Sequence, residues 1–281
     1  MKLADHTDKI RLLIDKSFRN RLGRMGILEK STLSIENIPY EYLEDRKRIE
    51  TIFDTLKKET KDKNKSDEEN YKNAYEKLVE EFTFTLFNRL AALKVMEAHT
   101  LHPEIVTRQT MHGGRSFSHL AWLEENPDQR NAEQEGLTKF LEDQFENLSN
   151  EINLFSLEYP YHLLPTAIEL NQIIEAFNEV EKDKDVEENI WQSDDVMGWL
   201  YESYNNYKKA AHKASKAKTE YNKVSIQSQV YTPRWVVKFL VDNSLGKLYL
   251  EMYPHSEIKN KYKIANAPGE QIRETKPLTE I

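Results

Sequence analysis

The segment "YKNAYEKLVEEFTFTLFNRLAALKVMEA" (residues 71–98) has the clearest helical pattern in the chain. Apolar side chains recur in it every three or four positions, which places them on one face of an α-helix. Between Phe82 and Leu93 apolar residues occur on several sides, so we expect a core helix from Glu69 to His99. The following His102-Pro103 is expected to prevent the helix from continuing. The expected buried residues are Leu78, Val79, Phe82, Leu86, Leu90, Leu93 and Met96.

Helical patterns also occur before and after this segment, whereas strand patterns are nearly absent. The charge-dense residues 57–70 are expected to form a solvated turn, residues 103–131 to be irregular, and residues 223–233 to be extended. The sequence therefore predicts a mostly α protein: a multi-helix domain over 1–190, a helical connector with a basic face over 191–224, and the start of a further domain over 225–281. The expected helices cover residues 4–22, 40–60, 132–150, 166–181 and 194–222.

Composition narrows the classes of function. The 281 residues contain eight glycines, no cysteine and a formal net charge of −8. The lack of cysteine excludes disulfides, thiolate catalysis and cysteine-bound zinc within these residues. No signal peptide or long apolar run is visible, which favours a cytoplasmic protein without membrane contact. The negative net charge means that any contact with DNA requires a local basic face.

A second informative segment is "SQVYTPRWVVKFLVDNSLGKLYLE" (residues 228–251). Thr232 is expected to be the N-cap of a helix, Pro233 its first residue, and Gly246 its C-terminal stop. The residues from Trp235 to Val241 would form its apolar face. An ordinary capped helix explains this pattern, and so does a helix N-terminus that binds a carboxylate.

This second segment closely resembles motif X, which begins the catalytic domain of amino-DNA methyltransferases. The resemblance is closest to the PglX-like adenine-specific DNA methyltransferases of BREX phage-defence systems, with type I modification subunits and fused restriction-methylases as relatives. Residues 81–98, 164–180 and 191–205 resemble the helical N-terminal region of this family, and residues 263–281 resemble the lead-in to its first cofactor strand, all in the same order. The resemblance therefore covers most of residues 40–281.

The resemblance implies S-adenosylmethionine as cofactor and adenine N6 in DNA as methyl acceptor. The Gln-x-(Phe/Tyr)-Thr-Pro turn of the relatives lines the cofactor pocket and matches Gln229, Tyr231, Thr232 and Pro233. In that family a Gly-rich segment and an (Asn/Asp)-Pro-Pro-aromatic loop complete the site, and neither occurs in this sequence. We therefore expect no catalytic residue here, weak or no cofactor binding, and no methyl transfer by this chain alone. "NIPY" (residues 37–40) resembles the catalytic loop but is interpreted as a helix start.

Two further segments are candidates for anion or metal binding. Lysines in residues 207–223 share one helix face and can follow a DNA backbone, although a solvated connector explains them equally well. Residues 99–119 contain four histidines without metal-ligand spacing, so no metal site is predicted, and Gly113-Gly114-Arg115 can offer donors to a phosphate. The candidate nucleic-acid contacts are Lys208, Lys209, Lys213, Lys216 and Arg115.

The sequence thus predicts part of a phage-defence DNA methyltransferase. The alternatives are a helical module that docks on a separate catalytic chain or another defence protein, and a stand-alone DNA-binding protein. Leaving the apolar face of residues 235–241 in water would forfeit several kcal/mol, at about 25 cal/mol per Å². We therefore expect it to be covered by the helical domain or by a partner, which includes a second copy paired through residues 233–245.

Overall fold

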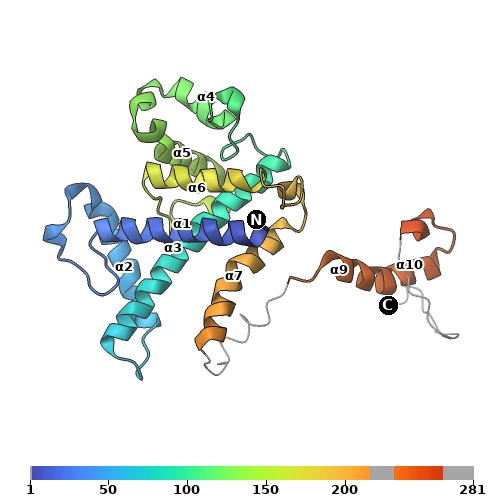
Figure 1. Cartoon of the computed structure of the whole chain (residues 1–281), viewed down its shortest axis with the longest axis horizontal. Coiled ribbons are helices and arrows are strands. Elements are labelled where there is room, and N and C mark those ends of the chain that lie inside the picture. Colours follow the sequence, from blue (N-terminus) through green and yellow to red (C-terminus); the bar gives the residue numbers. More distant parts are fainter. Residues whose placement is uncertain (1, 216–230, 262–281) are drawn as a thin grey trace. The chain divides into compact units, whose positions relative to one another are not determined.

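The computed structural model describes residues 2–215 and 231–261. The chain divides into two compact units, Met1–Thr219 and Glu220–Ile281. We describe each unit separately and call them the helical unit and the C-terminal unit (Figure 1).

The helical unit is built from seven described α-helices joined by short 3-10 turns. Within the described residues there is no strand, only isolated bridges between Ile27 and Thr32 and between Gln109 and Arg115. The mostly α prediction is therefore confirmed. The helices are α1 (Leu3–Arg24), α2 (Leu43–Glu59), α3 (Asp67–Ala98), α4 (Phe117–Glu125), α5 (Leu137–Ser149), α6 (Ala167–Val180) and α7 (Val196–Ser215), and the 3-10 turns are Ile35–Asn37, Tyr40–Tyr42, Thr110–His112, Pro127–Asn131, Glu133–Gly136, Asn153–Phe155 and Ile190–Gln192.

Helix α3 is the centre of the hydrophobic core, as its pattern predicts. Its predicted core residues are buried except Met96, which packs at the margin. Phe82 stacks on Phe18 of α1 at 5.3 Å, and Phe87 lies 5.7 Å from Phe177 of α6 between ring centroids. Helix α1 packs against α3, α6 and α7, so these four helices share one core.

Side chains and backbone turns fix the ends of α3. At its start, the Ser66 hydroxyl accepts from the Glu69 amide and the Glu69 carboxylate accepts from the Ser66 amide. Two such reciprocal bonds satisfy amides that the helix leaves open. The helix ends at Ala98, before His102-Pro103, because Thr100 turns left-handed with φ 56° and Leu101 donates its amide to the Met96 carbonyl.

Helix α4 corrects the expectation that residues 103–131 are irregular. It begins after Ser116, whose hydroxyl accepts from the His119 amide at 3.3 Å. The helix has nine residues, with Trp122 and Leu123 buried. So short a helix shows little periodicity, and packing rather than pattern stabilises it.

Helix α7 starts within the stretch that the sequence presents as a connector. It packs against α1, and its Leu200 and Tyr204 are buried in the shared core together with Trp191. The helical unit extends to Thr219. The three-part division at residues 190 and 224 stays a prediction.

The C-terminal unit contains α9 (Arg234–Val241), a π-helical turn (Asp242–Gly246), α10 (Lys247–Met252) and a 3-10 turn (Glu257–Lys261). Two expectations for this segment are wrong. Pro233, not Thr232, is the N-cap of α9, and Gly246 has helical angles (φ −62°, ψ −41°), so it does not stop the helix. The side chains of Asn243 and Ser244 bond back to the carbonyls of Phe239 and Leu240, so the chain stays coiled through the π turn.

Every described helix is too short or too polar to cross a lipid bilayer.

Candidate functional site

The first candidate is the turn that precedes α9. Tyr231 is half-buried, while Thr232 and Pro233 are exposed. Pro233 is extended (φ −56°, ψ 138°), and its carbonyl accepts from the amides of Val236 at 2.9 Å and Val237 at 3.2 Å. The turn therefore leads directly into a helix N-terminus, where the partial positive charge of the helix dipole favours a carboxylate. Gln229, the fourth residue predicted for this site, lies outside the described residues.

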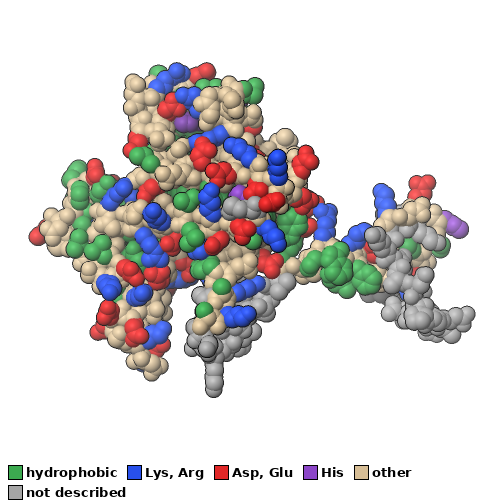
Figure 2. All heavy atoms as spheres, in the orientation of Figure 1, with side chains coloured by type: hydrophobic (Ala, Val, Ile, Leu, Met, Phe, Trp, Pro, Cys, Tyr) green, Lys and Arg blue, Asp and Glu red, His purple; other side chains and the backbone are tan. Residues whose placement is uncertain are grey.

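The apolar side chains that follow this turn are exposed, and their atoms form a green patch over α9 in Figure 2. Trp235 is 74% exposed, Leu240 59% and Leu245 61%. Such a patch is unusual for a helix that has its final packing partner. That the helical unit or a partner covers this face stays a prediction.

A buried carboxylate anchors the end of α9. Asp242 is 3% exposed and accepts from the Lys238 ammonium at 2.8 Å. The same ammonium donates to the carbonyl of Lys261 at 3.1 Å, so it ties α9 to the last described turn. Lys238 is thus part of the C-terminal unit's own framework.

The predicted DNA-binding lysines on α7 differ in their surroundings. Lys208 pairs with Glu80 of α3 and lies 5.9 Å from the centroid of the Tyr207 ring. Lys209 is half-buried, whereas Lys213 is exposed to solvent. Lys216 lies outside the described residues. The structure therefore places Lys213 where an external phosphate has direct access and gives Lys208 an internal partner.

Arg115 lies in the loop before α4 and has an internal partner as well. Its Nε and Nη2 donate to the two carboxylate oxygens of Glu135 at 2.7 and 2.5 Å. This bidentate pair raises the pKa of Arg115 and lowers the pKa of Glu135. It also clamps a turn in which Gln134 and Glu135 both have positive φ.

The histidines of residues 99–119 serve separate local roles. His119 is buried, stacks on Phe140 at 4.6 Å, and its Nε2 lies 2.9 Å from the Glu135 carbonyl. His102 bonds the adjacent Pro103 carbonyl, and His112 contacts Phe117. Among the described residues no group of His, Asp and Glu is arranged to hold a metal ion.

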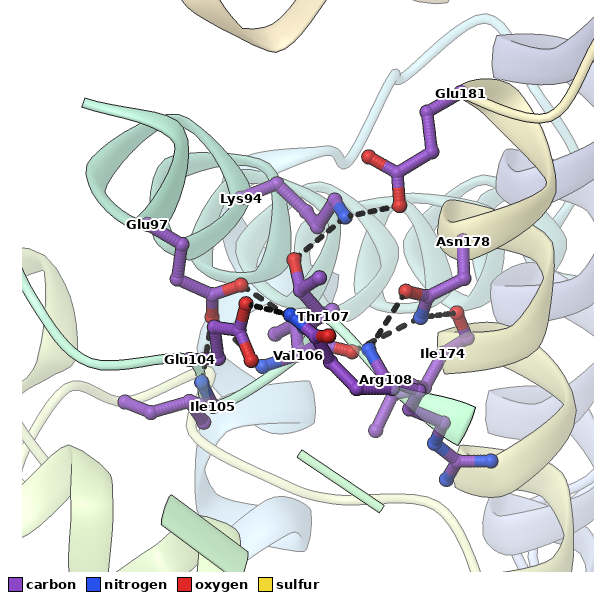
Figure 3. A network of polar contacts seen from close by, with 11 residues as sticks. Lys94, Glu97, Glu104, Ile105, Val106, Thr107, Arg108, Ile174, Asn178 and Glu181 are labelled. Atoms are coloured by element: carbon purple, nitrogen blue, oxygen red, sulfur yellow. Dashed lines mark hydrogen bonds and ion pairs between the residues drawn. The ribbon is translucent and has the colours of Figure 1, made fainter. Parts of the chain in front are cut away.

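A buried polar network fixes the segment that follows α3 (Figure 3). The Glu97 carboxylate accepts from the amides of Ile105, Val106 and Thr107 at 2.7–2.9 Å. Lys94 is 1% exposed and donates to the Thr107 hydroxyl and to Glu181.

Asn178 of α6 completes this network from the other side. Its amide donates to the Val106 carbonyl, and its Oδ1 accepts from the Arg108 amide. Together, α3 and α6 satisfy the backbone hydrogen bonds of the irregular segment 105–108.

A second buried cation fixes residues 153–162. Arg89 donates to the carbonyls of Leu154 and Ser156, and its Nη1 lies 2.6 Å from Nδ1 of His162. Burial, with added repulsion from Arg89 and Arg48, lowers the pKa of His162 to about 4. Burial also lowers the pKa of Arg89 to about 10. The neutral His162 ring therefore accepts the hydrogen bond.

Sequence reasoning did not identify these buried polar residues. Arg89, Lys94 and Glu97 are in helical phase with the apolar face of α3, since each lies four positions from Leu90 or Leu93. Charged residues in phase with a core face are the sequence signal by which they could have been found.

The sequence of the chain is similar to those of two known methyltransferases. No protein-family model matches the chain. The adenine-specific methyltransferase BrxX of Escherichia coli O9:H4 (strain HS) is 30% identical over 220 residues, which cover 71% of this chain and 18% of BrxX. The adenine-specific methyltransferase PglX of Lacticaseibacillus casei (strain Zhang) is 25% identical over 264 residues, which cover 81% of this chain and 21% of PglX. The chain thus spans about a fifth of the length of these relatives.

Proposed function

Because this chain is a homologue of the BREX adenine-specific methyltransferases BrxX and PglX over most of its length, we propose that it is the helical part of a phage-defence DNA methyltransferase. The proposed reaction is the transfer of a methyl group from S-adenosylmethionine to N6 of adenine. The single observation that carries the proposal is the 30% identity to BrxX over 71% of the chain.

Within this function we assign one side of the cofactor pocket to the turn before α9. The exposed Thr232 and the first amides of α9 suit the carboxylate of S-adenosylmethionine, and Tyr231 suits a packing contact. When bound, the cofactor supplies the methyl group. The chain's own residues position the amino-acid end of the cofactor and do not take part in the transfer.

These 281 residues contain neither a Gly-rich cofactor turn nor an (Asn/Asp)-Pro-Pro-aromatic loop. A flipped adenine needs hydrogen-bond acceptors for its amino group and a stacking partner. The proposal therefore is that the chain supplies scaffold and one pocket wall, and that methyl transfer requires residues supplied from elsewhere.

Calorimetry with S-adenosylmethionine tests this assignment. The purified 281-residue chain should give no binding heat at millimolar cofactor and should transfer no labelled methyl group to host DNA. In a complete methyltransferase that contains this segment, Thr232→Val with Tyr231→Ala should weaken cofactor binding about tenfold, which corresponds to the loss of one or two contacts. Lys247→Ala in α10 is the matched control. Turnover by the isolated chain, or equal cofactor affinity in both variants, would refute the assignment.

A second role, contact with the DNA backbone, is supported by the exposed Lys213 on α7. Lys213→Glu should lower the affinity for random-sequence duplex DNA and reduce the slope of log K against log salt by about one unit. Lys139→Glu, which changes an exposed lysine on α5, is the control and should leave that slope unchanged. Equal slopes in the two variants would exclude α7 as the contact.

A further inference from the structure

The negative charge of the chain is concentrated in one region. Residues 117–195, from α4 to the start of α7, contain 20 Asp and Glu but only four Lys and Arg. Their net charge of −16 exceeds the −8 of the whole chain, so the remaining residues carry a net +8. We call residues 117–195 the acidic segment. Bases from outside the segment pair with four of these carboxylates, through Lys9, Lys94, Arg108 and Arg115. The negative charge that remains repels a DNA backbone and attracts basic partners.

A cleft of about 500 Å³ is lined by residues of α4 and α5, at one end of this segment. Its apolar lining includes Pro103, Phe117 and Trp122, and its carboxylates are Glu125, Asp143 and Glu146. No lysine or arginine lines it. The cleft therefore combines an aromatic wall with a negative rim.

The three carboxylates of the cleft are not equivalent. Asp143 accepts from Trp122 Nε1 at 3.0 Å and from Lys139 at 2.7 Å, so internal donors hold its two oxygens. Glu125 and Glu146 are exposed, and within the described residues neither carboxylate has a hydrogen bond or an ion pair. These two carboxylates are available to an external cation.

Apolar side chains stand exposed near the same cleft. Phe117, the first residue of α4, lines the cleft and is 51% exposed, and its ring lies 5.9 Å from that of His112. Met111, beside His112 in the preceding 3-10 turn but not in the lining of the cleft, is 80% exposed. Exposed aromatic and methionine side chains next to a concave surface are typical of protein interfaces.

We propose that this cleft is a docking site for a basic amphipathic helix of a partner protein. An apolar side chain of that helix packs against Phe117 and Trp122, and its lysines or arginines pair with Glu125 and Glu146. Charge complementarity and the exposed Phe117 favour this occupant over DNA, because the phosphates would meet the unpaired carboxylates. The cleft and the proposed cofactor turn have no residue in common, so failure of the methyltransferase assignment leaves this proposal intact.

Fluorescence anisotropy with the labelled peptide LKKLLKKLLKKL, at near-physiological salt, tests the site in the full chain. The double variant Glu125→Lys/Glu146→Lys should weaken peptide binding about tenfold or more, as expected when two ion pairs become repulsions. The matched control is Glu187→Lys/Glu188→Lys, which makes the same charge change at two exposed positions of the acidic segment outside the cleft. It should change the affinity less than about twofold.

Two further measurements separate docking from general attraction. Phe117→Ser should lower the affinity for the same peptide several-fold. The alanine analogue AKKAAKKAAKKA should bind the unchanged chain weakly. Circular dichroism melting checks that each variant is folded. Equal losses in the cleft and control variants, or tighter binding of random duplex DNA than of the peptide to this segment, would overturn the proposal.

Discussion

At the scale of single residues, Glu97 is expected to contribute strongly to the stability of the chain. One carboxylate satisfies the three consecutive backbone amides of residues 105–107. We expect Glu97→Gln to destabilise the chain by about 2–4 kcal/mol, because an amide side chain cannot accept all three bonds and turns a donor toward buried N–H groups.

Urea unfolding followed by circular dichroism measures this loss. Glu124→Gln changes an exposed carboxylate on α4 and should alter stability by less than about 0.5 kcal/mol. A loss for Glu97→Gln no larger than that for the control would mean that water or a rearranged segment satisfies the amides.

His162 predicts a dependence of stability on pH. Its pKa is about 4 in the folded chain, chiefly because the ring is buried, and near 6.5 when unfolded. Between these values the unfolded state binds the extra proton, so stability is unaffected above the unfolded pKa and falls as the pH drops from about 6.5 toward 4. The full loss approaches about 3 kcal/mol at ~1.4 kcal/mol per pKa unit.

His162→Asn keeps an acceptor for Arg89 and removes the titrating ring. We expect the decrease in unfolding free energy between pH 6.5 and 4.5 to become smaller by about 2 kcal/mol in this variant. His255→Asn, at an exposed position of the C-terminal unit, should retain the decrease of the unchanged chain. Parallel pH profiles for all three proteins would contradict the role of His162.

At the scale of helices, the exposed face of α9 predicts self-association or binding to a partner. Trp235→Ser/Leu240→Ser should lower the weight-average mass measured by sedimentation equilibrium at high protein concentration, because the face that associates becomes polar. Leu12→Ser on α1 also removes an exposed leucine, 51% exposed, and should leave the mass unchanged. A monomer at all concentrations would exclude the second-copy arrangement.

The helices differ in how far the sequence predicts them. The long α3 and α6 have strong periodicity and reciprocal caps at Ser66 and Thr166, so the predicted bounds agree within two or three residues. The nine-residue α4 is short enough for tertiary packing to decide it. Gly246 remains helical because the π turn adds a residue and continues the coil, which no local pattern indicates.

The candidate site shows the same limit at residue level. The family resemblance predicts Tyr231, Thr232 and Pro233 as cofactor contacts, and this assignment stays a prediction. The partners of Lys208 and Arg115, which the sequence did not indicate, come from α3 and from the turn before α5. Such pairs join residues far apart in the chain. A single sequence carries no signal for which Glu will meet which Lys or Arg.

At the scale of the whole molecule, the helical unit contains its own core. Every fully buried member of the main hydrophobic cluster lies between Ile10 and Tyr204. We therefore expect a chain ended after Thr219 to fold and to keep the unfolding free energy of the 281-residue chain, measured in urea, within about 0.5 kcal/mol, because it retains every described residue of this core. A drop above about 2 kcal/mol, or loss of the cooperative transition, would show that the core needs the C-terminal unit.

The concentration of acidic residues in one segment also affects how the helical unit meets a charged polymer. Helix α7, with its lysines, lies at the opposite end of the unit from α4 and α5 (Figure 1). We expect this separation of charge to give the unit an electric dipole moment, on which a DNA duplex, the polymer proposed to contact α7, would exert a torque. Within a Debye length, about 10 Å at 0.1 M salt, that torque would turn α7 toward the duplex and the acidic end away from it. Raising the ionic strength would then slow the association as well as weaken the complex.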